Sequence, residues 1–296
     1  MQTYASFRVP ANVHGPFTRY KKEPTHGVRR ADVKENQVLG QLKEAWSKFS
    51  SYGHPDKNNY SEAIVLIQFR YSAEDVEKFS IALAEFQEES GFSAKAGIFL
   101  SALINNGTDE DYIIHTNHLT QTINLLGYEN TKNVIIDGNL GVFTFYKMKT
   151  GQVKVNGNVD NYIGKLMAGG QIIVNGNIDA WVGIEMSGGE LIVNGNVRIW
   201  LGSDMSDGKI VVNGNVDICV GWCMTGGMIV INEEVNGGVG KAMNGGEIHL
   251  NGGHGDEQHG YWGIQYSYKG KIYDGGKLIV ENGEFILEDG GRRKIY

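Results

Sequence analysis

The second half of the chain repeats one short pattern of apolar and polar positions, and equivalent residues recur at every nineteenth position. Each unit contains a short β-branched run, such as Gln171–Val174, bounded by Asn-Gly or Gly-Gly pairs that are typical of turns. The period is clearest in one asparagine column and the glycine column that follows it: Asn156, Asn175, Asn194 and Asn213, then Gly157, Gly176, Gly195 and Gly214. Such self-similarity is typical of a solenoid, in which each unit is one coil.

Stacked coils would place residues one period apart directly above one another, about 4.8 Å apart. The pattern therefore predicts a mainly β protein: a right-handed parallel β-helix of about seven 19-residue coils over 132–296, preceded by a small α/β module over 32–131. Two aliphatic columns should face inward: Val155, Val174, Val193, Val212, Ile231 and Leu250, and Leu140, Val159, Ile178, Val197, Val216 and Val235. A methionine column should fill the core beside a corner: Met148, Met167, Met186, Met205, Met224 and Met243.

Two further columns lie at the turns. The asparagines, continued by Asn232 and Asn251, should bond coil to coil as a side-chain ladder. Phe143, Tyr162, Trp181, Trp200 and Cys219 form another column. We interpret this second column as packing between coils; the alternative is a stripe that binds a ligand or a partner.

The repeated Gly-Asn-Val…Val-Gly…Met-x-Gly-Gly pattern resembles the GXGXG domain. That domain occurs at the C-terminus of the glutamate synthase large subunit and as one of the subunits of formylmethanofuran dehydrogenase. The resemblance covers about 132–252 and, less fully, 270–296. It implies a structural block that holds the catalytic parts of a complex together, with other subunits as partners and no catalytic residue to transfer. The glutaminase and flavin regions of glutamate synthase are missing from this sequence.

The front of the chain differs in composition. All four prolines and a basic cluster (Arg19, Lys21, Lys22, Arg29 and Arg30) lie between the N-terminus and Pro55. Residues 1–31 therefore predict an extended basic arm, either a mobile tail or a strap that docks to a partner. The module should contain a helix over 32–52, a buried strand Glu62–Tyr71, a helix capped by Ser72 and ended by Gly91, a helix Ser93–Asn105, a strand Tyr112–His115 and a helix Asn117–Leu126. We expect the last helix and its neighbours to cover the first coil.

Charge and composition exclude several classes of protein. Lys and Arg number 27 against 34 Asp and Glu, a net charge of −7, so we do not expect nucleic acid as a partner. No apolar run approaches the roughly 18 residues of a membrane helix. The N-terminus lacks a basic region that leads into an apolar stretch, so we expect a cytoplasmic protein without membrane contact. Two cysteines exclude a disulfide scaffold.

Candidate chemistry concentrates in residues 253–269, which interrupt the period. His254, Asp256, Glu257 and His259 could ligate zinc or another divalent ion, although a solvated loop explains the same residues. The other candidates have structural explanations: Cys219 and Cys223 as two buried thiols, His115 and His118 as incidental beside a helix cap, and Glu233-Glu234 as drift at a tolerant corner. The repeated Gly-x-Gly pattern lacks the strand–turn–helix context of a dinucleotide site, so no cofactor is expected.

These observations leave the catalytic status of the chain open and favour a non-catalytic scaffold subunit. The alternatives are an independent enzyme or a ligand- or metal-binding protein, with its site at the 253–269 loop or at the interface with the module. A third hypothesis is self-association of the solenoids into a symmetric homo-oligomer.

Overall fold

The structure is a computed structural model that describes residues 28–50, 57–253 and 269–294. The chain divides into two compact units, Met1–Gln37 and Val38–Tyr296. Of the first unit, only the start of a helix from Val28 onward is described, so the helix begins before the predicted position 32. The rest of the predicted arm lies outside the described residues. None of the described helices has both the length and the apolar character required to cross a membrane.

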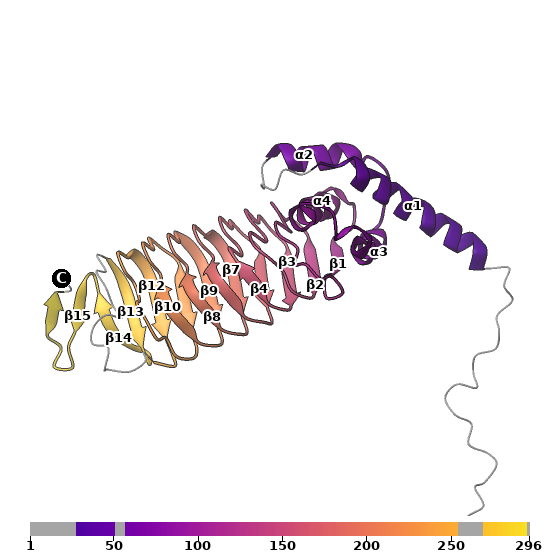
Figure 1. The fold of residues 1–296 in the computed structure, drawn as a ribbon. Coiled ribbons are helices and arrows are strands. Elements are labelled where there is room, and N and C mark those ends of the chain that lie inside the picture. The colour runs from indigo at the N-terminus through magenta and orange to yellow at the C-terminus, as the bar shows by residue number, and fades with distance from the viewer. Residues whose placement is uncertain (1–27, 51–56, 254–268, 295–296) are drawn as a thin grey trace, which may run out of the picture. The chain divides into compact units, whose positions relative to one another are not determined.

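Helices come first along the chain and strands follow (Figure 1). The helical elements are α1 (Val28–Lys48), α2 (Lys57–Leu66), α3 (Ala73–Ala82), the 3-10 helix η1 (Leu83–Phe86) and α4 (Phe92–Asn106). The strands are β1 (Asp111–His115), β2 (Asn133–Asp137), β3 (Gln152–Asn156), β4 (Val159–Asn161), β5 (Gln171–Val174), β6 (Ile178–Val182), β7 (Ser187–Val193), β8 (Val197–Leu201), β9 (Asp207–Val212), β10 (Val216–Val220), β11 (Met228–Ile231), β12 (Asn244–Leu250), β13 (Lys269–Asp274), β14 (Lys277–Glu281), β15 (Glu284–Ile286) and β16 (Arg292–Lys294).

The strands build a β-solenoid of about seven parallel turns, which confirms the predicted fold class. One long sheet has the order β1-β2-β3-β5-β7-β9-β11-β12-β13-β14-β15-β16, and a second sheet has the order β10-β8-β6-β4. Neighbouring strands within the repeat pair in parallel, and each residue pairs with its equivalent in the next coil, for example Val155 with Val174 and Val174 with Val193. Residues one period apart therefore lie above one another, as the sequence predicts.

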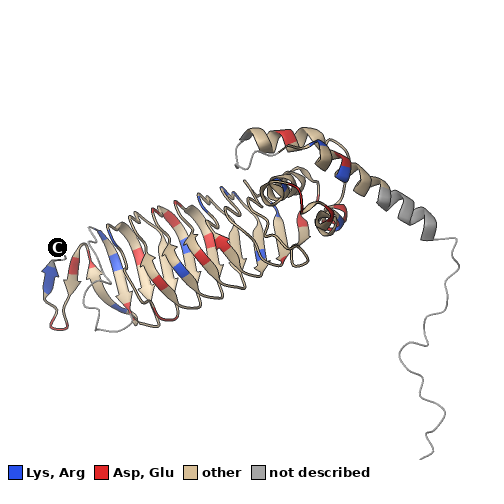
Figure 2. Ribbon diagram, in the orientation of Figure 1, with Lys and Arg blue, Asp and Glu red and all other residues tan. Residues whose placement is uncertain are grey.

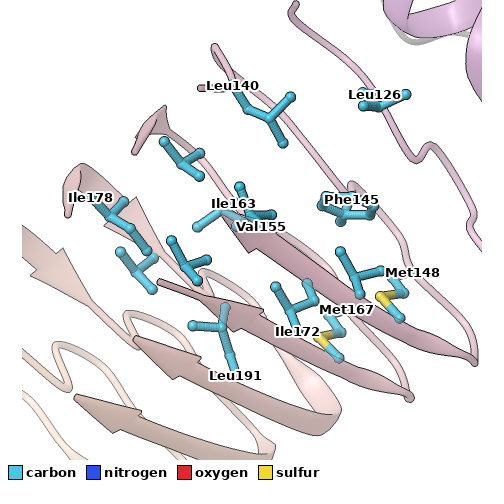
Figure 3. Close-up of a cluster of buried hydrophobic side chains, with 14 of the residues drawn as sticks. Leu126, Leu140, Phe145, Met148, Val155, Ile163, Met167, Ile172, Ile178 and Leu191 are labelled. Carbon is cyan, nitrogen blue, oxygen red and sulfur yellow. The ribbon is translucent and has the colours of Figure 1, made fainter. Parts of the chain in front are cut away.

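The predicted inward columns form the core. Every member of the two aliphatic columns and of the methionine column is at most 2% exposed. Figure 3 shows part of this core, including Met148, Met167, Val155 and Ile163. Each buried aliphatic side chain contributes about 1.5–3 kcal/mol relative to its exposed state, so coil stacking is the main source of stability.

The glycine columns have two different origins. Gly164, Gly183 and their equivalents have φ values between 61° and 68°, as turn glycines do. The column that begins at Gly157 does not have a positive φ. A Cβ on Gly195 would instead lie 2.5 Å from the carbonyl oxygen of Gly176 in the preceding coil. The Asn-Gly glycines are required by close approach between coils rather than by turn conformation.

Helix α3 forms as predicted. The Ser72 hydroxyl accepts a hydrogen bond from the Asp75 amide, and the Asp75 carboxylate accepts one from the Ser72 amide, which is a capping box. The predicted helix Ser93–Asn105 is also confirmed as α4, with Gly107 as its C-cap. Gly91, predicted to end the preceding helix, has φ 76° and is the N-cap of α4.

The predicted strand Glu62–Tyr71 is wrong, because its first half belongs to helix α2. Ala63 and Ile67 are fully buried, four positions apart, whereas Val65 between them is 71% exposed. This spacing follows the helical period, and α2 packs against α4. A short apolar run fits a strand or a helix equally well, so the tertiary contact decides.

The predicted helix Asn117–Leu126 is also wrong, since this segment forms part of the first coil. Ile123 bridges Leu140 in parallel, and the Leu125 amide donates to the carbonyl of Val142. The helix that contacts this coil is α4, where the Ser101 hydroxyl accepts hydrogen bonds from the amides of Gly127 and Tyr128. Because these backbone groups are bonded to the coil and to α4, the segment cannot also form its own helix.

At the other end the chain leaves the solenoid path. Strand β13 still pairs in parallel with β12, but β14, β15 and β16 follow as antiparallel neighbours. The last strand carries Arg292, Arg293 and Lys294, and Arg292 pairs with Glu281 and Glu284. Positive charge on a terminal strand discourages pairing with another sheet edge.

Candidate interaction surface

The outward face of the long sheet carries three columns of side chains, one of which is the predicted asparagine ladder. Each asparagine donates its Nδ2 hydrogen to the Oδ1 of its equivalent in the preceding coil. The N···O distances from Asn251 down to Asn175 are 2.8, 2.6, 2.7, 2.7 and 2.9 Å. The last member, Asn156, donates to Asp137 at 2.8 Å. The ladder confirms the prediction and occupies the amide groups of this column.

A second asparagine column lies two residues further along each coil. The Oδ1 of Asn139 accepts a hydrogen bond from the backbone amide of Asn158, at 2.8 Å. The same bond recurs at Asn158, Asn177, Asn196 and Asn215. The final donor is the amide of Glu234, so the Glu233-Glu234 pair keeps the coil-to-coil bond at this corner. These side chains are committed to holding coils together.

The middle column of the same face is mostly apolar, and it is the feature that sequence reasoning missed. In register, its members are Ile113, Ile135, Lys154, Ile173, Ile192, Val211, Val230, His249 and Tyr273. We call this set the outward aliphatic column. Ile113 and Ile135 are 38% and 42% exposed, and the four residues from Ile173 to Val230 are half-buried. Its signal in the sequence was the absence of polar alternation in runs such as Ile172–Val174.

A column of polar and charged residues, interrupted by one methionine, flanks the aliphatic column on its other side. Their order is Asp111, Asn133, Gln152, Gln171, Glu190, Lys209, Met228, Glu247 and Lys271. Glu190 pairs with Lys209 of the next coil at 3.2 Å. Hydrogen bonds from Gln171 and Lys209 hold the pKa of the Glu190 carboxyl below its usual value. Figure 2 shows charges of both signs interspersed along the solenoid strands rather than gathered by sign.

The predicted aromatic column forms a stack of rings, with one change. Phe143, Tyr162, Trp181 and Trp200 stack with centroid separations of 4.4, 5.5 and 4.6 Å and interplanar angles of at most 6°. The next ring comes from Trp222 at 4.4 Å rather than from the Cys219 position, and the Lys241 ammonium lies 5.1 Å from its centroid. Neighbouring rings cover most of the ring faces, so a ligand that needs a free aromatic face finds few here.

A scan against protein-family models gives no match for this chain, and a search of curated proteins gives none either.

The two cysteines show no sign of activation. Both thiols are half-buried, and burial raises the pKa of Cys219 and of Cys223. Lys241 opposes this shift at Cys219, whereas Asp204 adds to it at Cys223. A raised pKa keeps a thiol protonated and unreactive near neutral pH.

A histidine between two carboxylates joins α3 to the first coils. His115 Nε2 lies 3.0 Å from Glu77 Oε1, and its Nδ1 lies 3.6 Å from Asp137 Oδ2. The nearby Ser80 hydroxyl is buried and already donates to the carbonyl of Glu77, so it is not an available nucleophile. His115 is thus not incidental, as the sequence suggested, but connects a helix to the solenoid.

No predicted metal ligand can be placed. His254, Asp256, Glu257 and His259 all lie outside the described residues. Among the residues that the structure describes, no three His, Cys, Asp or Glu side chains are grouped closely enough to hold a metal ion.

One open cavity of about 540 Å³ lies beside the start of α3, lined in part by Arg70, Ser72 and Asp75. Ser72 and Asp75 are occupied by the capping box, and the amide of Ala73 donates to Asp109 at 2.6 Å. The helix N-terminus is therefore satisfied by the protein itself, and the cavity lacks converging groups for catalysis.

Proposed function

We propose that the chain is a non-catalytic structural subunit, a scaffold that assembles protein chains through the outward face of its long sheet. One observation carries the proposal. The asparagine amides, the aromatic rings and the methionines are all engaged within the solenoid, whereas the outward aliphatic column has no covering element among the described residues. An uncovered row of apolar side chains, here Ile173, Ile192, Val211 and Val230, favours protein association.

The resemblance to the GXGXG domain supports the same proposal. In glutamate synthase and in formylmethanofuran dehydrogenase, that domain holds the catalytic parts of a complex together. By this resemblance, the partners belong to an oxidoreductase or amidotransferase complex. The geometry adds which surface of this chain would take part in the assembly.

The test is gentle isolation of the tagged full chain from its own host, followed by native mass spectrometry. We expect a stoichiometric assembly that is lost in the variant Ile192→Lys, because a buried ammonium at the centre of the aliphatic column would have no partner. The matched control is Val65→Lys on α2, a more exposed apolar residue outside this face. A lone wild-type monomer, or an assembly that Ile192→Lys leaves intact, would contradict the proposal.

A further inference from the structure

The outward face of the long sheet is arranged so that it complements itself. Its three columns run in parallel along the solenoid: charged and polar residues from Asp111 to Lys271, the outward aliphatic column, and the asparagine ladder. Two such faces can be related by a two-fold axis that runs along the strands. The two solenoids then lie antiparallel, and each column faces the same column of the second copy in reversed order.

The charges select one register for this arrangement. With the axis between β7 and β9, Glu190 faces Lys209 of the second copy, and Lys209 faces Glu190. Moving outward, the polar column then pairs Gln171 with Met228, Gln152 with Glu247 and Asn133 with Lys271. Across the eight strands from β2 to β13 no like charges meet in this column, and the one like-charge pair, Asp111 with Glu281 of β14, lies at its outer margin.

The neighbouring registers are worse. An axis through β7 places Glu190 opposite itself, and an axis through β9 does the same to Lys209. A shift to the gap between β9 and β11 brings Glu190 against Glu247. The opposite shift, to the gap between β5 and β7, replaces the Glu190–Lys209 contact by Glu190 against Gln171 and brings Asp111 against Glu247. Parallel solenoids would place Lys154 of the aliphatic column against its own equivalent, and like charges in contact are costly.

The favoured register also matches the aliphatic column to itself. Ile192 faces Val211 and Ile173 faces Val230, so four apolar pairs across the two copies lie at the centre. The two irregular ends of the column face each other. Lys154 faces His249, and Ile135 faces Tyr273, whose ring stacks on His249 at 4.4 Å within the chain.

The size of the face suits a stable dimer. Eight strands, from β2 to β13, overlap in this register. At about 4.8 Å between strands and about 3.3 Å per residue, five residues wide, each copy covers roughly 650 Å². The total of about 1,300 Å² lies within the range of specific protein interfaces, about 1,200–2,000 Å².

We infer that the chain on this face is a second copy of the same protein, bound as an antiparallel two-fold dimer with its axis between β7 and β9. At the axis, the Glu190–Lys209 pair of each copy closes into a ring of four alternating charges. The inference rests on the proposed function, because it names the partner of the surface described there.

The test uses charge reversal in the purified full chain, measured by sedimentation velocity and native mass spectrometry. We expect the wild type to be a dimer. Each single variant, Glu190→Lys or Lys209→Glu, should raise the dimer Kd at least tenfold, because it places four like charges around the axis. A mixture of the two variants should form a heterodimer, since the two lysines at the axis of one chain then face two glutamates of the other.

The mixture distinguishes a lost interface from a folding defect. Both single variants lose the internal Glu190–Lys209 pair, so recovery of dimers in the mixture shows that the interface was affected and not the fold. The matched control is Asp179→Lys, which breaks the Asp179–Arg198 pair, also one repeat apart but on the other sheet. It should leave the dimer Kd unchanged. Thermal melts of all variants verify that the solenoid is folded.

Three results would overturn the inference: a wild-type monomer at 100 µM, single variants that dimerise like the wild type, or a mixture without heterodimers. These failures differ from failure of the proposed function. A recombinant monomer that forms a complex with other chains in its host refutes the second copy and leaves the scaffold role standing. A lone monomer in the host refutes both.

Discussion

At the scale of single residues, the same amino acid serves different purposes in different columns. Glycine at 164 and its equivalents allows a positive φ, whereas Gly195 makes room for the backbone of the preceding coil. The aromatic column adds a third case, because Trp181 and Trp200 both adopt φ 62°. A positive φ is costly for a bulky residue, and ring stacking between coils offsets this strain. The sequence predicted these columns but not why each one needs its residue.

The asparagine ladder predicts a graded loss of stability. Asn194 accepts from Asn213 and donates to Asn175, so Asn194→Ala removes two hydrogen bonds. At about 0.5–1.5 kcal/mol each, we expect a loss of about 1–3 kcal/mol. Asn251→Ala removes one ladder bond and should cost about half as much. Urea denaturation measures both, and equal losses would show that the ladder does not contribute bond by bond.

The raised pKa values of the two thiols predict how fast a thiol reagent labels them at different pH values. Because burial raises the pKa of Cys219 and Cys223, the folded protein should react with a thiol reagent at pH 8 more slowly than the urea-unfolded chain. The folded rate should continue to rise at pH values where the unfolded rate has levelled. A raised folded pKa also means that the two thiols favour folding below their unfolded pKa and lose that contribution as pH rises through the folded pKa. Faster labelling of the folded chain would indicate an activated cysteine.

At the scale of elements, prediction succeeded where local signals agree and failed where contacts between elements decide. The capping box at Ser72 specifies α3 from a few adjacent residues alone. Segment 62–71 is an apolar run without a clear period, and packing against α4 makes its first half helical. Segment 117–126 has helix-like spacing, but its backbone is bonded to the next coil and to α4. Neither contact can be inferred from the residues of the segment itself.

Substitution of two helix glycines should change the stability in opposite directions, because only one of them contacts the first coil. A Cβ on Gly97 of α4 would lie 1.7 Å from the carbonyl oxygen of Asn124. Gly97→Ala should therefore separate the helix from the coil and cost about 1–3 kcal/mol. Gly40→Ala in α1 meets nothing within 4 Å and should stabilise by about 0.5–1 kcal/mol through helix propensity.

Thermal melts combined with light scattering measure both glycine variants. We also expect Gly97→Ala to aggregate sooner, because an uncovered coil exposes unpaired strand groups. Equal melting temperatures for the two variants would mean that α4 does not cover the coil as described.

At the scale of the whole molecule, the solenoid is one-dimensional: each coil contacts the coils before and after it, and the columns continue through all of them. This is why a single 19-residue period was enough to predict most of the fold. The candidate surface was harder to foresee, because it depends on the summed outward positions of nine strands. The charge register along that face emerges only when those positions are aligned.

One-dimensionality predicts that a whole coil can be removed. Deletion of Gly176–Asn194 joins Asn175 to Gly195 and leaves every column in register. We expect a folded protein with a cooperative but lower thermal transition. Deletion of one residue fewer, 176–193, shifts the alternation so that inward residues turn outward, and this variant should not fold. Circular dichroism and protease resistance distinguish the two, and similar behaviour of both deletions would refute the column model.

The asparagine ladder also gives the solenoid a polarity. Every side-chain amide donates in the same direction, from Asn251 towards Asn156, so six amide dipoles add head to tail as peptide dipoles do in an α-helix. The positive pole of this series ends on the carboxylate of Asp137, which His115 also approaches. The series thus directs its positive pole at an acidic side chain, as the N-terminus of a helix does. The two ends of the solenoid are therefore electrostatically different even where the coils between them are alike.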